Sequence, residues 1–177
     1  MKFATLMALT AAASANSVQI DPFNIKNFMK VELVPKLLEN THNTAAKLIN
    51  GEEIVKAGTK VEWAQCDDDK GVFTFDDSSS ATPDPLVKGS DVALHLVGAL
   101  SDDIDLSKVH IHVDWNGTPL YDEDHTDNLP SSDPLDYSLK WSVPSYAPDG
   151  DYSVVLTGID NDGSSKDFCV TAKFSFQ

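Results

Sequence analysis

The chain has 177 residues, of which 28 are acidic and 13 basic, and its formal net charge is −15 at pH 7. Every basic residue is lysine, so the chain lacks the basic stripe and the bidentate arginines with which proteins hold phosphate backbones. This composition argues against nucleic-acid binding and against attachment to anionic membranes through a broad basic patch. The length indicates one domain with an additional segment.

The first residues have the pattern of a secretory signal peptide. A basic start at Met1-Lys2 precedes an apolar run over residues 4–13, and small residues end at Ala15. The run is too short for a membrane-spanning helix, which needs about 20 apolar residues. We therefore expect residues 1–15 to be removed and the protein to be secreted or to reside in an endolysosomal lumen. The alternative is a buried N-terminal helix.

Residues 16–58 differ in pattern from the remainder of the chain. Asp21-Pro22 is a typical helix start, and apolar residues over 23–34 recur at loosely helical spacing. Pro35 interrupts this pattern, and residues 37–49 suggest a second short helix. We expect a short, partly helical N-terminal segment. A propeptide, a packing arm on the following domain and a partly disordered lead all remain open.

The apolar period changes to two within residues 59–177. This alternation predicts strands at 59–65, 71–75, 90–100, 109–115, 118–122, 137–143, 152–156 and 168–176. Asn116-Gly117 predicts a two-residue type I′ hairpin, and the polar stretches 76–85 and 123–136 predict loops. The expected fold is all-β: an immunoglobulin-like sandwich of seven or eight antiparallel strands.

Cys66 and Cys169 are the two cysteines of the chain and bracket most of these strands. An even pair in an exported chain predicts a disulfide between them. Closing a loop of about 100 residues would restrict the unfolded chain by roughly 4–5 kcal/mol. The alternative is two free thiols in a reducing compartment.

Five runs in a fixed order resemble the ML lipid-recognition domain family, which includes the Niemann-Pick C-type sterol carrier and the phosphatidylglycerol/phosphatidylinositol transfer proteins. They are PLVKGS (85–90), GALSDDI (98–104), WNGTPLY (115–121), WSVP (141–144) and APDGDY (147–152). The similarity covers residues 60–177. It implies two sheets that splay around an apolar cavity, a lipid held tail-first, and an end-to-end disulfide by Cys66 and Cys169. Many members have further disulfides near the cavity mouth, and this chain has none to match them.

The resemblance implies a lipid-binding or lipid-transfer protein that carries a sterol or a phospholipid acyl chain. Its partners would be the lipid and, transiently, a membrane or a membrane protein; a monomer without enzymatic activity or cofactor is expected. The alternative is an immunoglobulin-like adhesion or carbohydrate-binding module with a closed core. Either would bury the same inward-facing residues, which we name as candidate cavity residues: Leu94, Leu96, Ile111, Val113, Trp115, Leu139, Trp141, Val154, Leu156 and Phe174.

Other chemical motifs are weaker. His110, His112 and Asp114 alternate on one expected strand, and a His-x-His pair on one face is able to ligate zinc. Residues i and i+4 of a strand lie about 13 Å apart, so we interpret the three as an outward polar face and expect no metal site and no metal-dependent hydrolase.

The chain has no nucleophile elbow and no expected catalytic residue. Asn116-Gly117-Thr118 is a sequon, which makes Asn116 a candidate glycosylation site.

Overall fold

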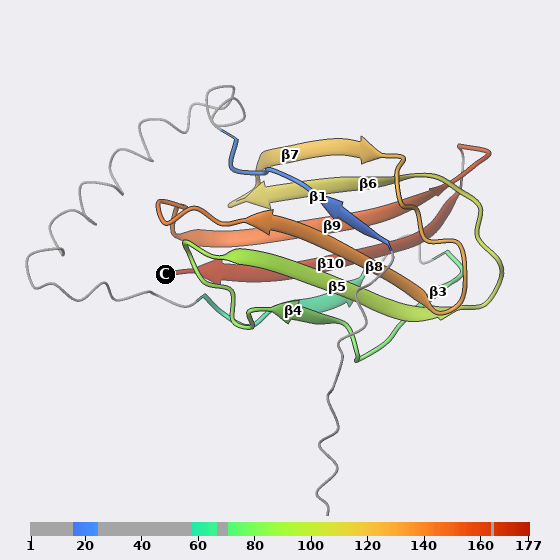
Figure 1. Ribbon diagram of the computed structural model, residues 1–177, viewed down its shortest axis with the longest axis horizontal. Helices are drawn as coiled ribbons and strands as arrows, with labels where there is room; N and C mark the ends of the chain where they lie inside the picture. The colour runs from blue at the N-terminus through green and yellow to red at the C-terminus, as the bar shows by residue number, and fades with distance from the viewer. Residues whose placement is uncertain (1–15, 25–57, 67–70, 164) are drawn as a thin grey trace, which may run out of the picture.

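The computed structural model describes residues 16–24, 58–66, 71–163 and 165–177, and in these residues ten strands form two sheets packed face to face (Figure 1). The all-β sandwich expected from the alternating pattern is confirmed. The expected signal peptide and the expected helices between residues 25 and 49 lie outside the described residues. Asp21 to Asn24, where a helix was expected to begin, form a turn.

The first sheet is built on the long ladder between β5 and β8. Its strands, in spatial order, are β1 (Ser17–Gln19), β8 (Leu135–Ser142), β5 (Asp91–Leu100) and β3 (Phe73–Phe75), and β4 (Ser80–Thr82) also pairs with β5. The β5–β8 ladder is antiparallel, whereas β1 runs parallel to β8. A parallel pair needs a long connection, and more than 100 residues separate these two strands.

The second sheet is antiparallel throughout. Its strands, in order, are β2 (Glu62–Gln65), β10 (Lys166–Phe176), β9 (Gly150–Asp160), β6 (Leu106–Trp115) and β7 (Thr118–His125). The turn between β6 and β7 has φ of 49° at Asn116 and 75° at Gly117. These two positive values are those of a type I′ hairpin, as the sequence predicts.

The described strands differ from the expected set in number and in extent. β1 and β4, of three residues each, were not expected, and β4 lies within the expected loop 76–85. The expected loop 123–136 is shorter, because β7 continues to His125 and β8 begins at Leu135. Residues 17–19 lie in the N-terminal segment, for which a propeptide, a packing arm and a partly disordered lead were open, and they form part of the sandwich.

The disulfide joins neighbouring strands at an edge of the second sheet. Cys66 directly follows β2, and its sulfur is bonded to that of Cys169 on β10, 103 residues later in the chain. The predicted pairing is therefore confirmed.

The described part of the chain contains no helix long and apolar enough to cross a membrane.

Candidate functional site

The ten candidate cavity residues all lie in the interior between the two sheets. They come from β5, β6, β8, β9 and β10, where alternate positions point inward because successive side chains of a strand face opposite sides. Each of the ten is at most 6 % exposed. The inward orientation expected from the alternation is thus present, and whether these residues line a lipid cavity is taken up below.

Aromatic contacts between the sheets lie at both ends of this interior. At one end Trp141 of β8 stacks on Phe174 of β10, with ring centroids 6.5 Å apart. At the other end Phe73 of β3 packs against Phe168 of β10, with centroids 6.0 Å apart. Between the two contacts the interior is mainly aliphatic, with Leu94 on β5 among its fully buried members.

Tyr137 places one polar atom in this apolar interior. It lies on β8 between Leu135 and Leu139, opposite Leu96 of β5, and its side chain is fully buried. Its hydroxyl is the one buried side-chain nitrogen or oxygen of the described residues that lacks a hydrogen-bond partner. Burial raises the pKa of Tyr137 to about 12. The candidate set omitted Tyr137, although its position in the β8 alternation is the signal that identifies it.

A polar group on β7 lies at the edge of the sandwich. The Tyr121 hydroxyl donates a hydrogen bond to Glu123 Oε2 at 3.2 Å and lies 2.7 Å from His125 Nε2. Burial, and next the nearby Glu123 carboxylate, raise the pKa of Tyr121. The amide of Asn128, in the loop after β7, donates to the Ser17 carbonyl of β1 at 3.4 Å. β1 is the end strand of the first sheet on this side and β7 the end strand of the second, and we call this region the β1–β7 edge.

The segment of residues 16–24 contacts both sheets. β1 pairs with β8 of the first sheet, and Ile20 and Phe23 after it are buried. The Phe23 ring lies 6.1 Å from the ring of Tyr152 on β9 of the second sheet. These contacts correspond to the packing-arm alternative for this part of the N-terminal segment.

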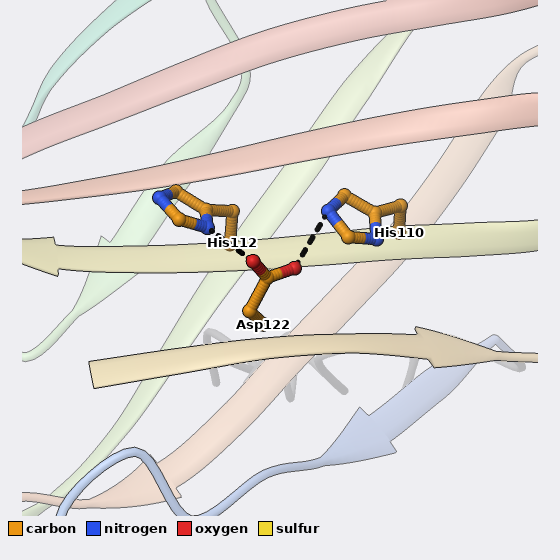
Figure 2. Close-up of side chains that lie close together, drawn as sticks. All are labelled: His110, His112 and Asp122. Atoms are coloured by element: carbon orange, nitrogen blue, oxygen red, sulfur yellow. Dashed lines mark ion pairs between the residues drawn. The ribbon is translucent and has the colours of Figure 1, made fainter. Parts of the chain in front are cut away.

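A second group of polar side chains lies on the outer face of the second sheet. His110 and His112 of β6 both face Asp122 of β7: His110 Nε2 is 3.1 Å from one carboxylate oxygen, and His112 Nδ1 is 3.4 Å from the other (Figure 2). Alternation along β6 groups the histidines with Asp114 but gives no sign of Asp122, because Asp122 comes from the neighbouring strand, where it is the register partner of His112.

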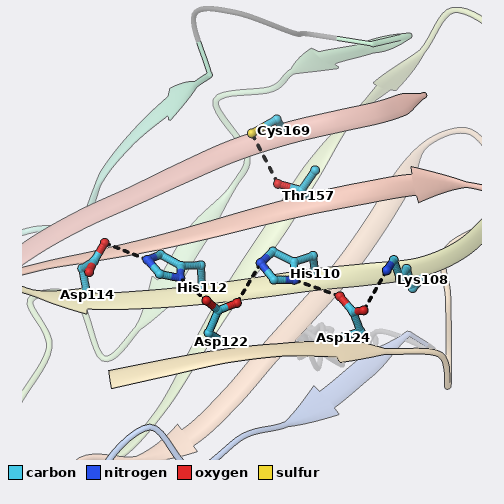
Figure 3. Close-up of polar contacts among 8 residues, drawn as sticks. All are labelled: Lys108, His110, His112, Asp114, Asp122, Asp124, Thr157 and Cys169. Atoms are coloured by element: carbon cyan, nitrogen blue, oxygen red, sulfur yellow. Dashed lines mark hydrogen bonds and ion pairs between the residues drawn. The ribbon is translucent and has the colours of Figure 1, made fainter. Parts of the chain in front are cut away.

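The remaining nitrogens of the two imidazoles also face carboxylates. His110 Nδ1 lies 2.8 Å from Asp124 Oδ1, and His112 Nε2 lies 3.0 Å from Asp114 Oδ2 (Figure 3). Lys108 Nζ donates to the other oxygen of Asp124 at 2.7 Å. The hydrogen bonds from Lys108 and from His110 hold the pKa of Asp124 below its usual range. The two imidazoles, the three carboxylates of Asp114, Asp122 and Asp124, and the Lys108 ammonium form one continuous network along β6 and β7.

Two surface hollows lie on the outer faces of the sandwich. One follows a row of cross-strand neighbours on the second sheet, Asp114, Ser153, Lys173 and Glu62, and the other a row on the first, Thr82, Ala93, Lys140 and Gln19.

The candidate glycosylation site, Asn116, borders the first hollow and is exposed. Its side-chain oxygen Oδ1 accepts a hydrogen bond from the Asp151 backbone N–H at 3.0 Å. Its glycosylation stays a prediction.

Comparison with known proteins places the chain in a family. The family model described as ML domain matches residues 60–176. Among solved structures, a crystal structure of a Niemann-Pick type C2 protein from Japanese carpenter ant matches with 11 % identity and a TM-score of 0.35, covering 70 % of this chain and 93 % of that one. A search of curated proteins finds no match. Because the family model spans most of the chain, the protein belongs to the ML domain family.

Proposed function

We propose that this protein binds a lipid between its two sheets and transfers it outside the cytosol, the cargo being a sterol or the acyl chain of a phospholipid. The ML domain family is a lipid-binding family, which supports the general class. Secretion or an endolysosomal location accords with the signal-peptide pattern and with the disulfide. The protein would act by binding alone, as a monomer, with transient contact to a membrane or a membrane protein.

The observation that carries the proposal is the unpartnered Tyr137 hydroxyl. Buried polar groups are nearly always hydrogen-bonded, and an unsatisfied one costs about 1–3 kcal/mol. Tyr137 is fully buried among apolar side chains, with no partner for its hydroxyl in the described residues. A mostly apolar ligand with one hydroxyl or carbonyl group would supply that partner while its hydrocarbon contacts the surrounding leucines.

The packed interior implies that the sheets must move apart to admit a ligand. Parting them breaks contacts such as Trp141 with Phe174. A buried lipid replaces these contacts, since each CH₂ group removed from water contributes about 0.8 kcal/mol. A chain of a dozen or more such groups therefore offsets a substantial opening cost.

We place the opening at the β1–β7 edge. At the opposite edge hydrogen bonds join the two sheets directly: the Val72 N–H beside β3 donates to the Asp167 carbonyl of β10 at 3.0 Å, and Gln65 Nε2 of β2 donates to the Phe73 carbonyl of β3 at 2.7 Å. At the β1–β7 edge the two edge strands belong to different sheets, and Tyr121, Glu123 and His125 provide polar groups able to face a lipid head group. A lipid would thus lie tail-inward with its head near this edge.

The test is a titration of the disulfide-intact protein, followed by tryptophan emission, with a fluorescent sterol and separately with a fluorescent phospholipid. We expect saturable one-to-one binding of at least one probe. A folded sample that binds neither, before and after extraction with organic solvent, would refute the proposal. Binding of a glycan instead would support the adhesion or carbohydrate-binding alternative.

Tyr137→Phe sharpens the test, and Tyr146→Phe is its matched control because Tyr146 is 46 % exposed. Loss of one hydrogen bond, worth about 0.5–1.5 kcal/mol, should weaken binding roughly 2- to 10-fold in the first variant and leave it unchanged in the second. Equal affinities in both variants would remove Tyr137 from the site.

A further inference from the structure

We propose that His110, His112 and Asp122 form a binding site for a divalent transition-metal ion on the outer face of the second sheet. One ligand atom from each residue lies within 4.8 Å of the others. Ligand atoms of a tetrahedral zinc ion, each about 2.0–2.1 Å from the metal, are separated from one another by about 3.3 Å. Each imidazole nitrogen lies at about that spacing from one of the two Asp122 oxygens: His110 Nε2 is 3.1 Å from Oδ1, and His112 Nδ1 is 3.4 Å from Oδ2.

The strand register brings the three side chains together. His110 and His112 are two residues apart, so both project from the same face of β6. Asp122 is the β7 neighbour of His112 and lies between the two rings, with one carboxylate oxygen turned to each (Figure 2). A rigid antiparallel pair thus supplies all three ligands, and no loop contributes one.

The outer carboxylates orient the imidazoles as metal sites require. A neutral imidazole carries one N–H, and Asp124 and Asp114 lie beside the outer nitrogens of His110 and His112 to accept it (Figure 3). The inner nitrogens then present lone pairs toward Asp122. A ligating histidine whose other nitrogen donates to a carboxylate is the usual arrangement around protein-bound metals.

The charge of the network also favours a cation. Three carboxylates, those of Asp114, Asp122 and Asp124, surround the two rings, and Lys108 supplies one compensating charge. The β9 residues next to His112 and Asp114 in register are Val155 and Ser153, which carry no charge. A divalent ion would balance the excess negative charge.

The donor set defines the class of metal. Two imidazole nitrogens and one carboxylate oxygen suit zinc and its transition-metal neighbours, whereas calcium and magnesium prefer oxygen ligands alone. Three protein ligands leave a fourth position for water. Bound metal would tie the edge strand β7 to β6, on the opposite face of the strand from Tyr121, Glu123 and His125.

An ordinary outward His–Asp pair elsewhere in the sandwich provides the comparison. His95 of β5 lies 2.8 Å from Asp136 of β8, and its side chain is 35 % exposed, the same as that of His110. Among the described residues, His110, His112 and Asp122 are the one group of three such ligands that converge. His95→Ala therefore removes a similar histidine without touching the proposed site.

The experiment is a calorimetric titration of the untagged, chelator-treated full chain with zinc chloride at pH 7.5, accompanied by cobalt(II) absorption spectra. We expect one zinc per chain and a tetrahedral cobalt spectrum. Asp122→Asn and His112→Ala should each weaken binding at least tenfold, whereas His95→Ala should match the wild type. Zinc should also raise the melting temperature of the wild type and of His95→Ala.

Three outcomes would overturn the inference: no zinc binding by the wild type, undiminished binding by Asp122→Asn, or binding of calcium in preference to zinc. Asp122→Asn keeps the size of the side chain at an exposed position, so this variant should fold normally. Weaker zinc binding by it would therefore reflect the lost ligand and not misfolding, even if His112→Ala fails to fold. Lipid titrations of the same samples test the proposed function separately, because the metal site does not depend on it.

Discussion

Trp141 of β8 and Phe174 of β10 stack across the two sheets, with ring centroids 6.5 Å apart and ring planes inclined by 27°. Phe174 in turn stacks on Tyr152, at 5.3 Å, within the second sheet. The three rings form a continuous aromatic contact that joins the sheets at one end of the interior. Any ligand that parts the sheets there must replace this contact.

Trp141→Ala should lower the free energy of unfolding by about 3–5 kcal/mol, because it removes a large buried ring and that ring's contact with Phe174 across the sandwich. Urea unfolding followed by circular dichroism measures the loss. Trp63→Ala is the control, since Trp63 is only half-buried on β2 and should cost less. Equal losses in the two variants would contradict the assigned role of the stack.

Removing the disulfide should destabilise the protein strongly. The bond closes a span of 103 residues, and the chain-entropy argument gives about 4–5 kcal/mol for a loop of that size. The Cys66→Ala/Cys169→Ala double variant should therefore unfold at a lower denaturant concentration than the oxidised wild type. Reduced wild-type protein serves as the control and should resemble the variant. An unchanged midpoint would show that strand pairing alone holds β2 to β10.

Tyr137→Phe should keep or raise the stability of the ligand-free protein, because it removes an unsatisfied buried hydroxyl while preserving the ring. The denaturation midpoint, compared with that of Tyr146→Phe, measures this. A loss above about 1 kcal/mol would indicate that the hydroxyl has a partner in solution.

Alkaline pH provides a second measurement on the same variant. The pKa of Tyr137 is raised from 10.0 to about 12, so the folded state favours the neutral phenol more than the unfolded state does. This contribution to stability is complete below pH 10 and is lost as the pH rises from about 10 through 12. Tyr137→Phe should reduce the alkaline loss, and Tyr121 and Tyr152, whose pKa values burial also raises, should maintain the remainder. An unchanged alkaline profile would contradict the burial of Tyr137.

Gly98→Ala should destabilise the protein by about 1–3 kcal/mol through overpacking. A Cβ at this β5 position would lie 2.1 Å from the Phe73 ring and 2.5 Å from the Thr74 carbonyl oxygen. Ala99→Ser, at the exposed next position, should have little effect. Adding Phe73→Leu to Gly98→Ala should recover part of the loss, which a double-mutant cycle measures. Strict additivity would show that the ring is not the obstacle.

Local patterns in the sequence were enough to predict the all-β class, the long strands and the Asn116-Gly117 hairpin. Alternation reports which side of a strand faces an interior, and a type I′ turn needs positive φ at two adjacent residues, which Asn-Gly tolerates. The inward orientation of Leu94 and Trp141 followed in the same way. The pairing of Cys66 with Cys169 also followed, because the chain offers no other cysteine.

Only the tertiary structure decided the features that depend on pairing between distant segments. The parallel position of β1, the stack of Trp141 on Phe174 and the isolation of the Tyr137 hydroxyl each depend on strands that are neighbours in space alone. Alternation along β6 groups Asp114 with the histidines, but only the β6–β7 register brings Asp122 between them. The physical reason is that side-chain periodicity is local, while strand register is set by backbone hydrogen bonds and packing across the whole fold.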